Sequence, residues 1–372
     1  MMAPAPQHIA LFASFSGEGG VERMLGRIAA GLLDTGCRVD LVLARSDGMH
    51  LAALPKGVRV VRLGVRHTAT AIRPLARYLR RERPDAILAA KDRGLRAAVI
   101  ARALSGTRPR LVGRIGTTVS AALADGPRWR YRIWSLGAHL FYPRADAVVA
   151  VSAGVQADVM AMSGLPAARV PVIHNPVIAP DLFRMAEAVP AHPWYARHEV
   201  PIVVGVGRLT RQKGFDVLLE AFAAVRRTRP LRLVLLGEGH QRERLVQRAR
   251  ELGIDADLAL PGFVNNPWAW IARADLFVLS SRWEGSPNAL TEALALGTPV
   301  VATDCPSGPR EILANGAVAP LVPVEDAAAL AAAITRVLDA PQARDALRAA
   351  ATSYTVEQSA AAYRRLLAGR DA

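Results

Sequence analysis

The chain has 372 residues and a formal net charge of +15 at pH 7, and half of its residues are apolar. Its length favours two domains of roughly 150–200 residues each, and its composition excludes a disordered chain. No apolar run reaches the roughly 18 residues of a membrane-spanning helix, which excludes an integral helical membrane protein.

The positive charge is concentrated in the first half. Residues 1–180 contain 25 Lys and Arg against 11 Asp and Glu, a net +14, whereas residues 181–372 contain 22 against 21, a net +1. Three explanations remain open: a nucleic-acid surface, an anionic membrane surface, or an arginine bias without function. Because no zinc-ligand spacing or RNA-binding aromatic motif is present, we expect no nucleic-acid partner. The two cysteines, Cys37 and Cys305, match no metal or redox spacing, so we expect a reduced, cytoplasmic setting.

Short apolar runs alternate with stretches of helical period along the whole chain. The predicted strands of the first half are 8–15, 38–43, 59–63, 86–90, 111–115 and 147–151. Those of the second half are 201–207, 231–237, 257–262, 275–281 and 299–303. Apolar strands separated by amphipathic helices predict parallel sheets covered on both faces. We therefore expect an α/β protein built from two doubly wound, Rossmann-like parallel-sheet domains.

The boundary between the domains is predicted from composition. Residues 1–178 form the first domain, 179–199 a proline-containing linker without strand period, and 200–355 the second domain. In open α/β sheets, ligands bind beyond the carboxyl ends of the strands. Two such domains facing each other would place a ligand in the cleft between them.

A glycine-rich loop follows the first predicted strand. Residues 16–20, which include Gly19 and Gly20, connect it to a helix. Glycines at a helix start let backbone N–H groups approach an anionic ligand, but a tight structural turn explains this composition equally well.

A second loop carries two cations. Arg208 follows directly on the apolar strand 201–207, and Lys213 precedes a helix that begins near Phe215. Two cations beside a helix N-terminus form an anion site. The alternative is that both are solvated loop charges.

The third loop, "SRWEGSPNALTEALALG", carries two glutamates, Glu284 and Glu292. Ser286 and Pro287 predict the N-cap and first residue of a helix that Gly297 ends. The amides of Asn288, Ala289 and Leu290 would then lack intrahelical partners, and either Ser286 or a phosphate could accept from them. Two glutamates around such a helix start suggest a ligand that carries hydroxyl groups.

These segments together resemble the retaining glycosyltransferases of family 4, which have the GT-B fold. "GRLTRQKGFDVLLEAF" is similar to their donor-diphosphate motif and "EGSPNALTEALALGTPVVATDCPSGPREIL" to their E-x7-E segment. "GEGGVERML" resembles their first glycine loop, and "VIHNPV" the end of their N-terminal domain. The resemblance implies that the first domain binds the acceptor, the second binds the nucleotide sugar, and 356–372 is a C-terminal helix that returns to the first domain.

The resemblance also implies roles for single residues. Arg208 and Lys213 would bind the donor diphosphate, Glu284 the sugar near its reacting carbon, and Glu292 the ribose hydroxyls. Gly19, Gly20, Asn288, Ala289 and Leu290 would contact the donor by position, and "LPGFVNN" places Gly262 and Phe263 beside the nucleobase.

The acceptor side departs from the family pattern. Many members carry a histidine after a strand of the first domain, where this chain offers Arg114, Thr117 and Thr118. These three are therefore the candidate acceptor contacts, and the acceptor is expected to be a glycan or a lipid-linked sugar.

The expected activity is transfer of a sugar, such as a hexose, from a nucleoside diphosphate, with UDP or GDP as the expected carrier. No D-x-D pair lies in a loop that would suit a metal, so we expect no metal and no cofactor, with the two cations stabilising the leaving diphosphate. Two alternatives remain open: a nucleotide-sugar epimerase of the same architecture, and a catalytically inactive scaffold. A dinucleotide-dependent dehydrogenase is disfavoured because "GEGG" lacks the required glycine spacing.

Basic and aromatic residues in the first domain suggest a membrane surface. Arg73, Arg77 and Arg80 recur at helical spacing, and "RWRYRIWSLGAHLFY" interleaves arginines with aromatic residues. Such helices suit the headgroup layer of an anionic membrane. A solvated arginine face beside a normally buried aromatic helix is the alternative. The charge asymmetry leads us to expect peripheral attachment to the inner face of the cytoplasmic membrane, in cell-envelope glycan or glycolipid assembly.

Overall fold

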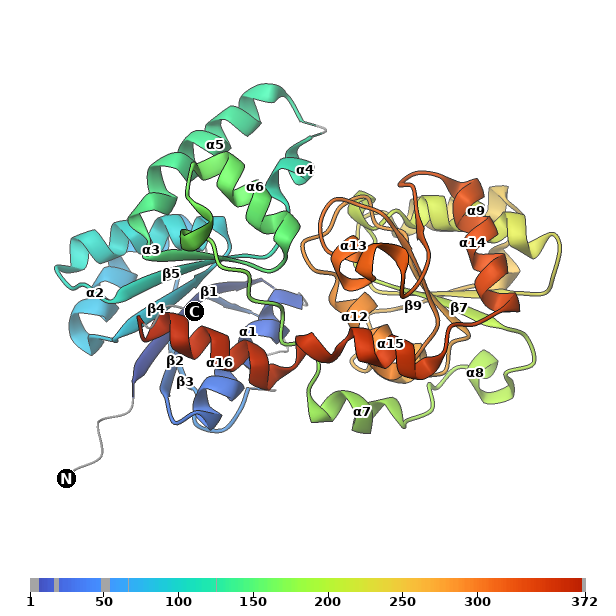
Figure 1. Cartoon of the computed structure of the whole chain (residues 1–372), viewed down its shortest axis with the longest axis horizontal. Coiled ribbons are helices and arrows are strands. Elements are labelled where there is room, and N and C mark those ends of the chain that lie inside the picture. The colour runs from blue at the N-terminus through green and yellow to red at the C-terminus, as the bar shows by residue number, and fades with distance from the viewer. Residues whose placement is uncertain (1–6, 17–19, 48–53, 66, 125, 370–372) are drawn as a thin grey trace. The chain divides into compact units, whose positions relative to one another are not determined.

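The computed structural model describes residues 7–16, 20–47, 54–65, 67–124 and 126–369 (Figure 1). The chain divides into two compact units. Unit 1 comprises Met1–Pro176 and Tyr354–Ala372, and unit 2 comprises Val177–Ser353. Each unit contains one six-stranded sheet in which every pairing is parallel, so the predicted doubly wound α/β architecture is confirmed.

The sheet of unit 1 has the strand order β3-β2-β1-β4-β5-β6. Its strands are β1 (His8–Ser16), β2 (Arg38–Asp47), β3 (Arg59–Arg62), β4 (Ala86–Ala90), β5 (Arg110–Ile115) and β6 (Ala147–Ala150). Its helices are α1 (Gly20–Asp34), α2 (Ile72–Glu82), α3 (Asp92–Ser105), α4 (Val119–Leu123), α5 (Arg128–Phe141), α6 (Ala153–Ser163) and α16 (Val356–Leu367). The strand order reverses between β1 and β4, where open sheets of this kind bind ligands.

Two apolar cores cover the two faces of this sheet. One core packs α1 and α16 on the sheet, and the other packs α2, α3 and α6 on the opposite face. The C-terminal helix α16 lies close against α1, since a Cβ atom at Gly31 would lie 2.4 Å from the Cβ of Ala360. Helix α16 is therefore part of unit 1 although it follows unit 2 in the sequence (Figure 1).

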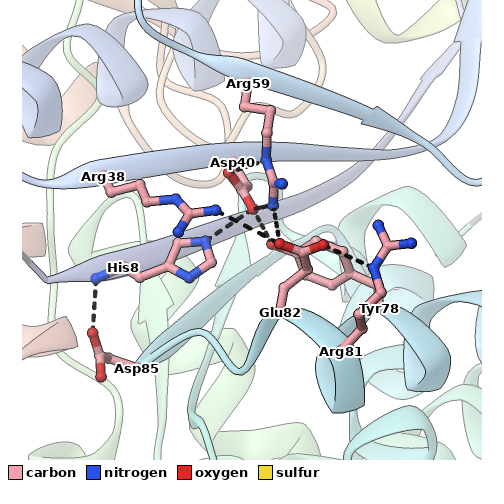
Figure 2. Close-up of polar contacts among 8 residues, drawn as sticks. All are labelled: His8, Arg38, Asp40, Arg59, Tyr78, Arg81, Glu82 and Asp85. Carbon is pink, nitrogen blue, oxygen red and sulfur yellow. Dashed lines mark hydrogen bonds and ion pairs between the residues drawn. The ribbon is translucent and has the colours of Figure 1, made fainter.

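A buried polar network ties the amino ends of the strands in unit 1 together (Figure 2). Asp40 on β2 is fully buried and accepts hydrogen bonds from His8 Nε2 at 2.9 Å, Tyr78 Oη at 2.6 Å and Arg59 Nε at 2.9 Å. Arg59 also donates to Glu82 at 2.6 Å. Burial opposes the charge of Asp40, but the hydrogen bonds from Arg59, Tyr78 and His8 outweigh it and lower its pKa to about 2. The network joins β1, β2, β3 and α2 at the amino ends of the strands. A ligand is expected at the opposite, carboxyl ends.

The sheet of unit 2 repeats the scheme with the order β12-β11-β10-β7-β8-β9. Its strands are β7 (Ile202–Val206), β8 (Arg232–Leu236), β9 (Leu258–Gly262), β10 (Leu276–Leu279), β11 (Val300–Thr303) and β12 (Leu321–Val322). Its helices are α7 (Pro180–Ala186), α8 (Pro193–Arg197), α9 (Phe215–Arg226), α10 (Arg242–Glu251), α11 (Pro267–Ala272), α12 (Asn288–Leu296), α13 (Pro309–Ile312), α14 (Ala327–Asp339) and α15 (Arg344–Ala350). Among the described residues, no helix is both long enough and apolar enough to cross a membrane.

The segment 179–199, predicted as a linker, contains helices that its composition did not indicate. It forms helices α7 and α8 and belongs to unit 2. Pro180 and Pro193 stand at the first helical position of each helix, where proline is favoured. Arg273 anchors α7, because its guanidinium donates to the carbonyls of Ala186 and Glu187 at 2.7 and 2.6 Å.

Candidate functional site

Three loops lie together at the carboxyl ends of the strands in unit 2; they follow β7, β8 and β10. This end of the sheet is called the carboxyl edge below. The loop after β7 begins at Gly207 and contains a short 3-10 helix, Arg211–Lys213. Arg208 is exposed at the start of this loop. The stem of Lys213 lies over Gly207, because a Cβ there would meet Lys213 Cε at 2.8 Å. Both predicted cations are therefore at the sheet edge where a ligand is expected.

Lys213 and Glu284 form a close ion pair. Lys213 Nζ lies 2.6 Å from Glu284 Oε1, and their side chains are 18% and 8% exposed. Ser281 Oγ donates to the same carboxylate oxygen at 2.6 Å. The structure thus brings together the predicted diphosphate cation and the predicted sugar carboxylate, which are 71 residues apart in the sequence.

The backbone of the Lys213 loop lies directly against the loop after β10. Gly214 has φ +61°, and a Cβ there would lie 2.0 Å from the carbonyl oxygen of Ser280. Ser280 Oγ donates to the carbonyl of Lys213 at 2.8 Å. Only glycine fits this contact. The contact in turn fixes the position of the Lys213 backbone relative to the loop after β10.

The start of α12 differs in detail from the prediction. The helix begins at Asn288 with Pro287 as its N-cap, and the side chain of Pro287 supplies no hydrogen bond. The N–H of Leu290 donates to the carbonyl of Pro287 at 3.1 Å, so the expectation that this amide lacks an intrahelical partner is wrong. The predicted end is correct, since Gly297 adopts a left-handed conformation with φ +73°. Asn288 and Ala289 form the first turn.

The second glutamate, Glu292, lies on the same helix and is 3% exposed.

Cys305 is also buried, in the loop after β11. Burial and the nearby charge of Glu284 raise the pKa of the Cys305 thiol to about 12. The Cys305 thiol therefore stays protonated at neutral pH.

Gly262 and Phe263 lie at the end of β9 and just after it. Gly262 has φ +86°, and a Cβ there would lie 2.6 Å from Glu238 Oε1. The N–H of Gly237 donates to the carbonyl of Gly262 at 2.8 Å. Phe263 is partly buried. The expected nucleobase loop is thus bonded to the loop after β8.

The loop after β8, Gly237 to Gly239, is a part of this edge that sequence reasoning missed. A Cβ at Gly237 would lie 2.0 Å from the carbonyl oxygen of Gly207, and one at Gly239 would lie 2.3 Å from that of Leu209. Both glycines are therefore required by close backbone contacts with the Arg208 loop. Two glycines directly after a buried strand were the available signal.

A second missed residue is Arg282, which directly precedes the Glu284 segment. Its guanidinium donates to Asp216 Oδ1 and Oδ2, both at 2.9 Å, and to Glu325 at 2.6 Å. The available signal was an arginine two residues before Glu284, three residues beyond the end of the buried strand β10.

In unit 1, the candidate acceptor residue Arg114 lies within β5, and Thr117 and Thr118 stand between β5 and α4. Arg114 is 2% exposed and donates to the side-chain oxygen of Asn175. Thr118 is buried at the N-cap of α4, and Thr117 is partly exposed. The structure therefore turns Arg114 into the interior of unit 1 and leaves Thr117 as the most open of the three. Gly20 begins α1, and Gly19 lies outside the described residues.

Comparisons with known proteins identify the family. Residues 193–354 match the family Glycosyl transferases group 1, and residues 18–179 match Glycosyltransferase Family 4. The two matches together cover most of both units.

Two curated relatives act in glycan assembly according to their names. An N-acetylgalactosamine-N,N'-diacetylbacillosaminyl-diphospho-undecaprenol 4-alpha-N-acetylgalactosaminyltransferase of Campylobacter jejuni is 30% identical over 191 residues, 50% of this chain and 49% of that protein. The lipopolysaccharide core biosynthesis glycosyltransferase LpsE of Rhizobium meliloti is 34% identical over 140 residues, 38% of this chain and 40% of that protein. Each match spans less than half of the relative's own length.

A solved structure shows the same fold over nearly the whole chain. The crystal structure of Anabaena Alr3699/HepE in complex with UDP and glucose matches with a TM-score of 0.79 and 21% identity, over 98% of this chain and 100% of that chain. The chain belongs to the group 1 glycosyltransferases of family 4 and has the GT-B fold that its motifs predict.

Proposed function

We propose that this protein is a retaining, metal-independent glycosyltransferase that moves a sugar from a nucleoside diphosphate to a glycan or lipid-linked acceptor. The observation that carries the proposal is the Lys213–Glu284 pair at the carboxyl edge of unit 2. It joins a cation suited to a diphosphate with a carboxylate suited to a sugar.

In this proposal the chemical step is departure of the nucleoside diphosphate from the reacting sugar carbon. Negative charge grows on the leaving phosphate oxygens while the sugar ring becomes positively charged. Arg208 and Lys213 would stabilise the phosphate charge from fixed positions, which needs no reorganisation during the reaction. Glu284 would contact the sugar near its reacting carbon, and Glu292 the ribose.

The relatives' names support the acceptor class. One of them acts on a diphospho-undecaprenol-linked sugar and the other in lipopolysaccharide core biosynthesis. We therefore propose lipopolysaccharide or polysaccharide assembly, with the enzyme on the cytoplasmic side and unit 1 receiving the acceptor. UDP is the first carrier to test, because Alr3699/HepE was crystallised with UDP and glucose.

Two linked measurements test the proposal. In a thermal-shift panel of nucleoside diphosphates and nucleotide sugars, the true donor at 100 times its dissociation constant should stabilise the protein by about 2.7 kcal/mol. The selected nucleotide sugar is then incubated with and without a lipid-linked acceptor. Diphosphate release that requires the acceptor supports transfer, release without acceptor identifies an epimerase or hydrolase, and no stabilisation by any nucleotide rejects the donor site.

A further inference from the structure

Helix α5 exposes an apolar stripe. Trp129, Ile133, Leu136 and Leu140 are 60%, 61%, 59% and 45% exposed. At about 100° per residue they lie within an arc of roughly 60° on one side of the helix. Four large apolar side chains on one exposed face are more than the scattered hydrophobics of an ordinary surface.

The opposite side of α5 already has its packing partner. Ala138 belongs to the core of unit 1, with Trp134 and Phe141 packed against it, and Ser135 Oγ donates to the Met162 carbonyl of α6 at 3.2 Å. Figure 1 shows α5 beside α6. The helix is thus apolar on two opposite sides, and folding of the described residues covers only one of them. The alternative of a normally buried aromatic helix does not account for the other side.

The charged residues beside the stripe distinguish between two possible partners, a second copy of the helix and a lipid surface. In heptad terms the stripe has the 4-3-4 spacing of a coiled-coil seam, and Arg130, Arg132 and His139 occupy the flanking positions. All three side chains are exposed. A second copy of this helix would bring arginines against arginines, which disfavours self-association. An anionic bilayer accepts both features, because acyl chains cover the stripe and headgroups pair with the arginines.

We propose that this stripe and its flanking arginines form a docking face for an anionic lipid surface. The inference deepens the proposed function by giving a lipid-linked acceptor a surface on unit 1, the unit with most of the positive charge. It adds α5 to the arginines predicted on α2, of which Arg80 donates to the carbonyls of Leu104 and Ser105 at 3.0 and 3.3 Å.

Co-sedimentation of the full chain with vesicles tests the docking face. Vesicles of phosphatidylcholine alone are compared with vesicles that contain about 30% of the anionic lipid phosphatidylglycerol. Binding should require the anionic lipid and fall with salt. An I133E/L136E variant should lose at least about tenfold in vesicle affinity, because it puts charges on the apolar stripe. R130E/R132E should lose at least as much, because each basic residue near such a surface contributes a factor of about five to the affinity.

Matched controls carry the same chemical changes elsewhere. V189E changes an exposed valine of unit 2, and R244E/R250E reverses two exposed arginines of α10. Both controls should bind as the unaltered protein does. Equal binding to neutral vesicles, absence of binding, or full binding by I133E/L136E would overturn the proposal. A wild-type dimer that I133E/L136E converts to monomer would assign the face to a second copy instead. Because vesicle binding needs no sugar transfer, the outcome is independent of the proposed activity.

A separate observation concerns Arg282, which links the two loops that carry Lys213 and Glu284. Besides its paired bonds to Asp216, Arg282 Nη1 donates to the carbonyl of Arg211 at 2.8 Å. The backbone N–H of Arg282 donates to the carbonyl of Gln212 at 2.7 Å, and Gln212 Nε2 donates to the Trp283 carbonyl at 2.9 Å. The side chain of Arg282 is 11% exposed, so these bonds are largely shielded from water.

Arg282 and its partner Asp216 each stand close in sequence to one member of the Lys213–Glu284 pair. Asp216 stands in the first turn of α9, three residues after Lys213, and Arg282 stands two residues before Glu284. We infer that Arg282 is a positioning residue that holds Lys213 and Glu284 in register. This second inference rests on the proposed function of that pair.

Replacing Arg282 by lysine keeps the charge but removes the two-pronged bond to Asp216. R282K should lower kcat by roughly tenfold at saturating donor and weaken UDP binding, and D216N should give the same effect without adding to it. The control is R226K, because Arg226 Nε pairs with Asp257 at 2.7 Å in the same unit, away from the loops. R226K should change only the melting temperature.

Wild-type kcat in R282K at unchanged substrate affinity would overturn the inference, as would equal losses in R226K. If the unaltered enzyme transfers no sugar, the proposed function fails. Calorimetric UDP affinity then still tests the positioning role, and an R282K affinity equal to wild type rejects it.

Discussion

Lys213 Nζ lies 2.6 Å from Glu284 Oε1, although the two residues come from different loops of unit 2. The pair places a cation and a carboxylate at the edge where parallel α/β sheets bind ligands. Neither side chain is a simple surface charge, since they are 18% and 8% exposed. A donor that carries both a diphosphate and a sugar would contact both members, which is the basis of the following predictions.

Removing either loop cation should impair transfer without unfolding the protein. In Arg208→Ala and Lys213→Ala, each lost charge-assisted hydrogen bond is worth roughly 1.5–3 kcal/mol, so transfer should fall roughly 10- to 150-fold. Steady-state kinetics measures the loss. Arg211→Ala is the control, because it removes a cation from the same loop whose guanidinium lies 4.0 Å from Glu325. Wild-type turnover in either test variant would contradict the diphosphate assignment.

The two glutamates should separate in kinetics. Glu292→Ala should mainly raise the KM for the donor, because ribose hydroxyls are held alike in the ground and transition states. Glu284→Ala should mainly lower kcat, because its proposed partner is the reacting sugar. Initial rates over a range of donor concentrations distinguish the two. A raised KM in both variants, with kcat unchanged, would make Glu284 a binding residue only.

Gly214 should tolerate no side chain. Its φ is +61°, and a Cβ would meet the Ser280 carbonyl oxygen at 2.0 Å. Gly253 has φ +68° with nothing within 4 Å, so Gly253→Ala measures the conformational cost alone, roughly 1 kcal/mol. Gly214→Ala should cost more than this in chemical denaturation and should also reduce transfer. Equal stability losses and equal activities in the two variants would show that the loop contact does not fix Lys213.

The Asp40 network should make unit 1 acid-sensitive. The pKa of Asp40 is lowered from 3.8 to about 2, so its charge stabilises the fold above pH 3.8, and this contribution is lost as the pH falls toward 2. The shift corresponds to about 2 kcal/mol. Asp40→Asn should destabilise the protein at pH 7 by at least this amount and flatten the decline of stability between pH 4 and 2. Asp345→Asn, at a side chain that is 98% exposed, is the control. Unchanged stability in Asp40→Asn would contradict the network's role.

The architecture was predictable because the strands carry a simple signal. Buried parallel strands are nearly continuous apolar runs, and all six predicted strands of the first half are present with ends within a few residues of the structure. The two helices of the segment 179–199 were not predicted because proline there begins helices instead of breaking them. The segment is held by hydrogen bonds from Asn266 and Arg273, which lie about 80 positions away in the sequence. Its local composition gives no sign of these contacts.

The candidate site was predictable only in part for the same reason. Lys213 and Glu284 stand in recognisable motifs, and the structure brings them together. The roles of Arg282, Gly237 and Gly239 follow from contacts between loops, which a single sequence does not display. Arg114 lies within β5 and is buried against Asn175, whereas Arg208 lies beyond the end of β7 and is exposed. An arginine near the carboxyl end of an apolar strand is therefore not by itself evidence of a ligand contact.

Calorimetric titration of the full chain with UDP and GDP tests the central claim most directly, because it measures the diphosphate site without requiring the acceptor. The account predicts binding of one of them at one site per chain, weakened roughly tenfold or more in Lys213→Ala and little changed in Arg211→Ala. Binding of neither nucleotide, or equal affinity in Lys213→Ala and the unaltered protein, would contradict it.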